Sequence, residues 1–435
     1  MKRWRIFSLL AALAGLALLI GCKPAAATNW AASTDCKACH SGETSSTYGL
    51  EVIANEATYA QSGHYNGPRV DTTLLAATAG EHFTFEGSDA MYDNGSDCSK
   101  CHTDQGFVSW LANPNTTNTS TTFSAASPPG CFTCHAPHET GDFSLRNTSP
   151  VTLQDQTTTY NYGKGNFCVN CHQNLNTPAS TLKGYAVTAQ SPVVPVMSWG
   201  VRTGPHHGDQ SDFIMAANFS HEGANSYLVS KHVTAAGAPQ DSCVGCHEYQ
   251  PTTDLRGSLQ LGGHGFYLMG DVHNSIKYVT ALCQNCHNTG SNYTVFTGPT
   301  GHPAASDWGG LGHTSDMLLE IQDMRNILIG YFATAANFAA GGALILTPAG
   351  TGYTMVPAPA GSNEWNRDWV FTSATVQVTQ NQSQALWNLH IFMEDRSNGI
   401  HNPTGAAQLL WDSIDMLHND PLHPGVAASG NRPPN

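Results

Sequence analysis

Charged residues are scarce in this chain of 435 residues. Asp, Glu, Lys and Arg make up 11% of the sequence, less than half of the usual quarter, which excludes a coiled coil and a charge-rich disordered protein. Positive charge is the scarcer kind, because 18 Lys and Arg stand against 32 Asp and Glu and leave a net charge of −14. Since the chain lacks a basic face to attract phosphate backbones, we expect no nucleic-acid partner.

Long hydrophobic runs are also missing beyond the first 22 residues, so the sequence predicts no later membrane span. Residues 1–21 begin with three basic residues and continue with an apolar stretch, as secretory signal peptides do. The ending Gly21-Cys22 resembles the lipobox of bacterial lipoproteins, which implies cleavage before Cys22 and lipidation of that cysteine. Lys23, rather than Asp, then implies sorting to the outer membrane. The alternative is a plain signal peptide with an incidental cysteine.

Cysteine and histidine, by contrast, are abundant. The chain has 13 Cys and 21 His, and ordinary secreted chains collect Cys for disulfides without collecting His. The twelve cysteines after Cys22 form six copies of one pattern, Cys-x-x-Cys-His, with none left over. The copies are Cys36-Lys-Ala-Cys39-His40, Cys98-Ser-Lys-Cys101-His102, Cys131-Phe-Thr-Cys134-His135, Cys168-Val-Asn-Cys171-His172, Cys243-Val-Gly-Cys246-His247 and Cys283-Gln-Asn-Cys286-His287.

This pattern has the spacing that covalent haem attachment requires. Two thiols must each form a thioether with one of two vinyl groups on the same porphyrin edge, and two intervening residues give that reach. The histidine after the second thiol becomes the proximal iron ligand. We therefore predict six covalently bound c-type haems. Zinc ribbons and redox dithiols are the competing interpretations, but zinc sites do not need His invariably in the next position and redox dithiols do not come in sixes.

The spacing of the motifs predicts how the chain is organised. The 414 residues from 22 to 435 give 69 for each of six haems, too few to wrap each haem separately. We therefore expect residues 22–300 to form a contiguous hexahaem electron-transfer region. Residues 301–435 lie beyond the last motif, which ends at His287, and contain no attachment motif. We expect them to form a haem-free helical segment that packs on the array. The predicted fold class is mainly α with extensive irregular loops, a multihaem cytochrome c array covered by that C-terminal segment, with little β-structure.

Three helices are expected in the C-terminal segment. Apolar residues recur at helical spacing over about 315–338, and a second helix is expected over about 383–395. Asn402 can cap a third helix that has Pro403 in its first position and runs to about His418. The stretch Ala339–Gly361, which is rich in Gly, Ala and Pro, is expected to be a loop.

Six proximal histidines leave 15 of the 21 histidines, enough for a second, distal ligand on every iron. The sequence contexts of several resemble those of the periplasmic and extracellular multihaem c-type cytochromes of metal-reducing bacteria, especially a group of outer-surface lipoprotein cytochromes. These contexts are Ser62-Gly63-His64, Cys134-His135-Ala136-Pro137-His138, Gly204-Pro205-His206-His207-Gly208-Asp209-Gln210, Ser230-Lys231-His232, Gly262-Gly263-His264 and Gly399-Ile400-His401-Asn402-Pro403.

The resemblance implies a set of distal ligands: His64, His138, His207, His232, His264 and His401. His206 is the close rival of His207, and His273 and His302 are the strongest other candidates. A histidine placed as His138 is, three residues after a proximal one, binds a neighbouring haem in such cytochromes. The remaining histidines, His390 among them, are interpreted as surface or core residues.

These predictions point to an electron carrier rather than a substrate-specific enzyme, and no catalytic residue is assigned. We expect a cytochrome anchored in the outer membrane by lipid, at the cell surface or, alternatively, facing the periplasm. Its expected partners are other redox cytochromes or a porin–cytochrome conduit, and extracellular acceptors such as metal oxides, metal ions or other cells. Two alternatives stay open: a multihaem reductase of a small oxyanion such as nitrite, and a subunit of an extracellular cytochrome filament.

Overall fold

The computed structural model describes residues 54–66, 99–112, 129–174, 205, 208–220, 226–250, 261–271, 276–284, 287, 307–312, 317–338, 344–346, 369–371 and 378–433. Of the described residues 51% are helical and 4% are in strands, so the predicted mainly helical class with many loops is confirmed. The chain divides into two compact units. The first holds the described residues within 83–146, and the second those within 54–82 and 147–435.

The first unit contains four short helices, two of which belong to motifs. They are α7 (Ser99–His102), α8 (Asp104–Ala112), α9 (Cys131–Cys134) and α10 (Pro137–Thr140). Thr133 of α9 donates a hydrogen bond of 2.6 Å to the buried carboxyl of Asp104 at the start of α8, and its oxygen accepts one from the Gly130 amide. Arg146 donates to the Phe132 carbonyl at 2.6 Å. Polar contacts therefore hold α9 in place on both sides.

The motif-bearing part of the second unit consists of equally short elements. They are α4 (Gly63–Asn66), β1 (Val151–Thr152), β2 (Thr159–Tyr160), α11 (Gly165–Val169), α13 (Gln210–Met215), α14 (Lys231–Thr234), α15 (Cys243–His247), η3 (Gly263–Gly265), β3 (Met269–Asp271), β4 (Ile276–Tyr278) and α16 (Thr280–Gln284). The strands pair as antiparallel ribbons, β1 with β2 and β3 with β4.

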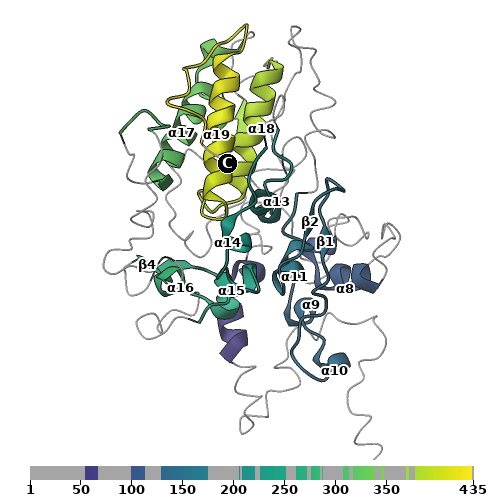
Figure 1. Ribbon diagram of the computed structural model, residues 1–435. Helices are drawn as coiled ribbons and strands as arrows, with labels where there is room; N and C mark the ends of the chain where they lie inside the picture. The colour runs from purple at the N-terminus through teal and green to yellow at the C-terminus, as the bar shows by residue number, and fades with distance from the viewer. Residues whose placement is uncertain are drawn as a thin grey trace, which may run out of the picture. The chain divides into compact units, whose positions relative to one another are not determined.

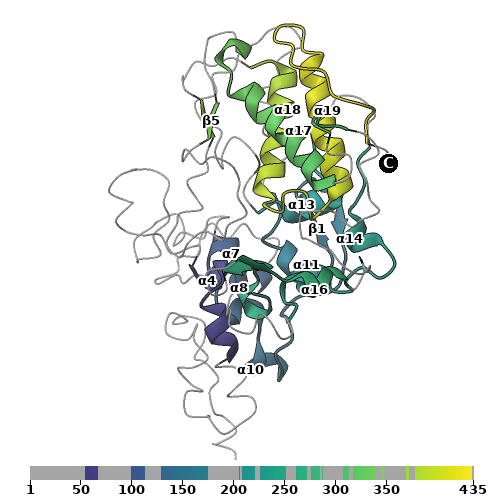
Figure 2. The same ribbon diagram turned by 90° about the vertical axis from the view of Figure 1, so that its left-hand side faces the viewer.

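The C-terminal segment forms three long helices that lie side by side (Figures 1 and 2). They are α17 (Met317–Phe332), α18 (Gln380–Glu394) and α19 (Pro403–His418), and a short 3-10 helix, η4 (Ala335–Asn337), follows α17. Their apolar faces meet in one core, in which Leu328, Leu389 and Leu410 are fully buried. Helix α13 packs at one end of this bundle, where the Phe213 ring lies 5.9 Å from that of Phe392. The three predicted helices are thus confirmed.

Helix α19 begins where its sequence predicts. The Asn402 side-chain oxygen accepts a hydrogen bond of 3.0 Å from the Gly405 amide, and Pro403 occupies the first helical position. The same side chain donates to the carbonyls of Phe213 (3.1 Å) and Leu228 (2.8 Å). One asparagine therefore caps the helix and also joins it to the motif-bearing part of the unit.

One expectation differs from the structure. The stretch Ala339–Gly361, expected to be a loop, contains strand β5 (Leu344–Leu346), which pairs antiparallel with β6 (Trp369–Phe371). Runs of aliphatic and aromatic residues favour strands, but this pairing joins distant segments and so leaves no local signal. The expected division at residue 300 stays a prediction, and the described residues on both sides of it belong to the second unit. Among the described residues no helix is long and apolar enough to cross a membrane.

Candidate functional site

Three pairs of histidine rings lie within the second unit. Each pair joins a histidine of a Cys-x-x-Cys-His motif to a histidine of the predicted distal set. The pairs are His64 with His172 (ring centroids 5.8 Å apart), His247 with His401 (6.1 Å) and His232 with His287 (6.1 Å). The sequence named these six residues but did not say which belongs with which.

In the first pair the two rings face each other through their Nε2 atoms. These atoms lie 3.5 Å apart, and the ring planes are close to perpendicular, at 88°. Burial, together with the nearby His172 and His247, lowers the pKa of His64 to about 3. His64 is therefore neutral at ordinary pH, which is the form in which imidazole binds a metal.

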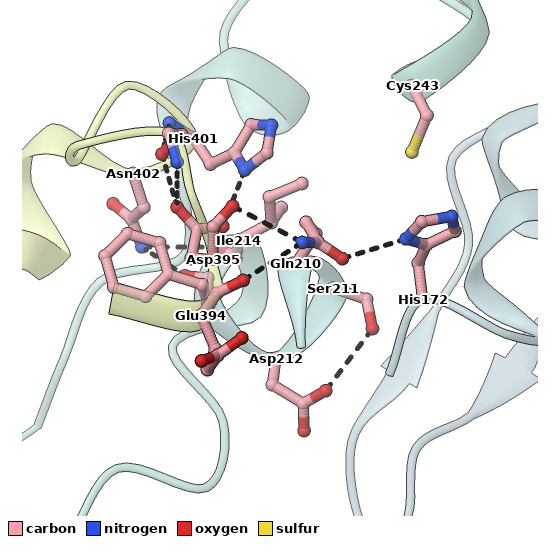
Figure 3. Close-up of polar contacts among 12 residues, drawn as sticks. His172, Gln210, Ser211, Asp212, Ile214, Cys243, Glu394, Asp395, His401 and Asn402 are labelled. Carbon is pink, nitrogen blue, oxygen red and sulfur yellow. Dashed lines mark hydrogen bonds and ion pairs between the residues drawn. The ribbon is translucent and has the colours of Figure 1, made fainter. Parts of the chain in front are cut away.

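Gln210 sets the orientation of His172 (Figure 3). Its amide nitrogen points toward the backbone carbonyls of Glu394 and Asp395, at 3.3 and 3.4 Å, so its oxygen must face the other way. That oxygen lies 2.9 Å from Nδ1 of His172. Because an amide oxygen only accepts, Nδ1 carries the proton, and the lone pair of His172 is on Nε2, facing His64.

Asp395 plays the corresponding part for His401. Its carboxylate oxygen lies 2.6 Å from Nδ1 of His401, and the Ser397 hydroxyl and amide donate to its other oxygen. The Ser397 oxygen in turn accepts a hydrogen bond of 3.0 Å from the His401 amide. Burial tends to lower the pKa of His401, but the charge of Asp395 and its hydrogen bond raise it. The short connection between α18 and α19 thus presents His401 in a single orientation.

The partner of His401 is oriented by the main chain. Nδ1 of His247 lies 2.8 Å from the Phe266 carbonyl oxygen, so it donates its proton there and leaves Nε2 as the acceptor. Burial lowers the pKa of His247, and the neighbouring His401 acts in the same direction. Outside this unit, Nδ1 of His135 lies 3.3 Å from the Ser144 carbonyl oxygen, which is the same arrangement for a third motif histidine.

The third pair is connected to the second through the backbone. The Ser230 side chain caps α14 by accepting a hydrogen bond from the His232 amide. Burial lowers the pKa of His232, as does His287 beside it, while backbone hydrogen bonds with Ile400 and His401 act against this. The ring of His232 therefore contacts the residues that carry the second pair.

The cysteines of two motifs also lie together. Gly165 is the first residue of α11 and lies close to the start of α15. A Cβ atom added to Gly165 would lie 2.9 Å from Cβ of Ser242 and 3.1 Å from the Cys243 amide nitrogen. A hydrogen bond with Cys168 is the main cause that lowers the pKa of the Cys243 thiol, against burial. The motif cysteines that the structure describes form no disulfide.

This arrangement fits six-coordinate haem iron. An iron between two imidazoles needs about 4 Å between the two nitrogens, given metal–imidazole bonds of about 2 Å such as those of zinc, and the observed separation in the first pair is 3.5 Å. Two of the three motif histidines that pair, His172 and His247, also have their Nδ1 atom within hydrogen-bond distance of an acceptor, as metal-bound histidines do. Two protein nitrogens suffice because a porphyrin supplies the four in its own plane. Within the described residues, no group of three or more Cys, His, Asp or Glu is placed to hold a metal ion.

Other predicted ligands lie in different surroundings. The ring of His138 lies 6.0 Å from that of Phe132, and the ring of His264 lies 6.1 Å from that of Phe266. Their ligand roles stay predictions. His390 is buried in α18, 3.6 Å from Glu394, in keeping with its interpretation as a core residue. The predicted residues outside the described part of the chain are Cys22, Cys36, Cys39, His40, Cys98, His207 and Cys286, with the rivals His206, His273 and His302.

Sequence reasoning missed the residues that orient the rings. Gln210 closes the Gly204–Gln210 context, and Asp395 lies six residues before His401, but neither stands in a helical or strand repeat with the histidine it contacts. The Phe266 carbonyl gives no sequence signal at all, because every residue has a backbone carbonyl.

In comparisons with known proteins, the chain matches no family model, no curated protein and no solved structure. The case for a function therefore rests on these residues and their geometry.

Proposed function

We propose that this protein is a hexahaem c-type cytochrome that relays electrons at the outer membrane or cell surface. The observation that carries the proposal is the pairing of three motif histidines with three predicted distal histidines, at ring separations of 5.8 to 6.1 Å. A chance placement of spare histidines would have no reason to select the residue after a Cys-x-x-Cys pair. The haems, when bound, supply one-electron oxidation and reduction.

The pairs favour electron transfer over catalysis on a substrate. With a histidine on each side, an iron has no position left for a small molecule, whereas a reductase needs one open position. The chain's own contribution is to hold the rings of each pair in a fixed orientation. Gln210, Phe266 and Asp395 do this for His172, His247 and His401 through contacts with Nδ1, from three different segments.

The contacts between the pairs support a relay with a defined order. Gln210 contacts His172 through its side-chain oxygen and the carbonyls of Glu394 and Asp395 through its side-chain nitrogen, and Asp395 contacts His401. The thiols of Cys168 and Cys243 are also hydrogen-bonded to each other. His232 is hydrogen-bonded to the backbone at Ile400 and His401. The sites of the fourth, fifth and sixth motifs are therefore consecutive, with the fifth in the middle.

The cellular setting of the proposal comes from the sequence. Cys22 would anchor the mature chain by lipid, and the excess of acidic over basic residues would favour docking to cationic surfaces or metal ions. Redox partner cytochromes or a porin–cytochrome conduit would deliver or remove electrons, and extracellular acceptors such as metal oxides, metal ions or other cells would complete the path.

The first experiment is spectroscopy of the purified, full-length mature protein. Intact-mass analysis should give six covalent haems, low-temperature EPR of the oxidised protein should show low-spin iron throughout, and carbon monoxide should leave the reduced optical spectrum unchanged. A chain without covalent haem would refute the proposal. A high-spin haem that binds carbon monoxide would instead favour the reductase, and end-to-end polymers in electron micrographs of the secreted fraction would favour the filament subunit.

A further inference from the structure

The three oriented histidines in the second unit differ in the acceptor that their Nδ1 proton meets. His172 meets a neutral amide oxygen of Gln210 at 2.9 Å, and His247 meets a neutral peptide carbonyl at 2.8 Å. His401 meets the carboxylate of Asp395 at 2.6 Å, the shortest of the three contacts. The acceptor of His401 therefore carries a full negative charge, while the other two carry only dipoles.

The surroundings of Asp395 do not cancel this charge. Its side chain is fully buried, and the groups on its second oxygen are the neutral hydroxyl and amide of Ser397. The acidic groups near it are Glu394, which lies 3.7 Å from Arg396, and Asp209, whose pKa is raised well above its usual value by burial and by Asp395 itself. In a water-poor interior such a charge acts more strongly than it would at the surface.

A hydrogen bond to a carboxylate makes imidazole a stronger electron donor than a hydrogen bond to an amide does. A more basic ligand and a nearby negative charge both stabilise the oxidised iron, which carries one more positive charge than the reduced iron. The effect should be confined to the iron held by His401, because Gln210 presents only its neutral amide to His172. One site of the three is thus built differently from its neighbours.

We propose that Asp395 is a positioning residue that lowers the reduction potential of the haem held by His247 and His401 below that of the haem held by His64 and His172. This rests on the proposed function. The site of the fifth motif is then less easily reduced than the site of the fourth, so electrons that pass from the fourth to the fifth do so against this difference in reduction potential.

The test is the variant Asp395→Asn in the mature, haem-loaded protein. Asparagine keeps the shape, and its oxygen can still accept from Nδ1 of His401. Its NH2 group cannot accept from the Ser397 amide as the carboxylate oxygen does, so the variant removes the charge together with that hydrogen bond of 3.3 Å. We expect one of the six midpoints in an optical and EPR redox titration to rise by a tenfold change in its equilibrium constant or more, about 59 mV for one electron. We also expect the EPR signal of one low-spin haem to move and the other five to stay.

A matched control and a reverse variant sharpen the result. Asp412→Asn changes another buried carboxylate, which pairs with Arg432 at 2.8 Å, and should move no midpoint. Gln210→Glu offers His172 a carboxylate and should lower one midpoint, the opposite sign. If Asp395→Asn leaves six low-spin haems with unchanged midpoints, or merely abolishes one low-spin signal, the inference is overturned while the proposed function stands. Absence of covalent haem in the parent protein would overturn the proposed function itself.

Discussion

Helices α17, α18 and α19 are 15 or 16 residues long and share one buried apolar core, whereas the helices α9, α11, α15 and α16, which carry motif cysteines, are four or five residues long. Isolated helices below about 12 residues are marginal in water even in favourable sequences. Side-chain packing therefore accounts for the C-terminal bundle but not for the motif-bearing helices.

The apolar clusters near the motifs are correspondingly small. One consists of six buried residues around Tyr160 and Ile214, and another of Leu261 and Val279 with partly buried neighbours. Under the proposed function, porphyrin faces supply the buried apolar surface that is missing here. The comparison shows that the bundle in the second unit has a large apolar core of its own, whereas the motif-bearing part has only small ones. Under the proposed function that part would depend on its haems for stability, and this can be tested on both parts.

Removal of one attachment motif should have the largest effect. In the double variant Cys243→Ala with Cys246→Ala, we expect the loss of one haem, of the low-spin signal at His247 and of protection against proteolysis around residues 226–250. The bundle α17–α19 should stay resistant. Intact mass and limited proteolysis measure this. The matched control, Cys131→Ala with Cys134→Ala, removes a motif of the first unit and should leave residues 226–250 protected; equal damage in both variants would contradict the comparison.

Truncation of the bundle core should come next. Leu410→Ala deletes a fully buried side chain and should lower the free energy of unfolding by about 2–5 kcal/mol in denaturant titrations followed by far-UV circular dichroism. Leu422→Ala, at a leucine that is 48% exposed, is the matched control and should change it by less than about 0.5 kcal/mol. Similar losses from the two variants would mean that the bundle core does not carry the stability assigned to it.

Loss of the α19 cap should have a smaller effect. Asn402→Ala removes the hydrogen bond to the Gly405 amide and those to the carbonyls of Phe213 and Leu228, and we expect a cost of about 1–2 kcal/mol. The same denaturant titration measures it. Asn419→Ala, at an exposed position at the other end of α19, provides the comparison and should be nearly neutral. A neutral Asn402→Ala would show that this junction contributes no stability.

The free energy of unfolding should also depend on pH. Burial raises the pKa of Asp212 in α13 to about 7, although hydrogen bonds from the Asn174 amide and the Asn218 side chain act to lower it. Because the folded pKa lies above the unfolded one, this group contributes stability that is fully present below about pH 4 and is lost as pH rises toward 7, by no more than about 1.4 kcal/mol per pH unit.

Asp212→Asn should remove this part of the pH dependence, which chemical denaturation at a series of pH values between 4 and 8 would show. Asp155 provides the control, because hydrogen bonds from Thr157 and Thr158 lower its pKa against the effect of burial. Asp155→Asn should therefore leave the slope between pH 5 and 7 unchanged. A slope of the same size in the parent and in Asp212→Asn would assign the dependence to another group.

Local signals predicted the parts of this molecule that depend on local chemistry. Asn402 and Pro403 predicted the start of α19 because capping involves residues three apart in sequence. The histidines of the motifs could be named as proximal ligands because the expected attachment needs two thiols and a ring within five residues, and that role stays a prediction. The pairing of His64 with His172, 108 positions apart, had no such signal. Nor did Asp395, whose role arises only once α18 and α19 turn back toward the motif of Cys243.

The position of His401 at the start of the last helix has a consequence for how the protein is made. Under the proposed function the chain is exported from its N-terminus, so all six Cys-x-x-Cys-His motifs would emerge before His401 does. A haem attached at Cys243 and Cys246 would then lack His401 until more than 150 further residues had been exported. Completion of that haem site would depend on the folding of the C-terminal bundle, and the last helix would be the final part of the site to form.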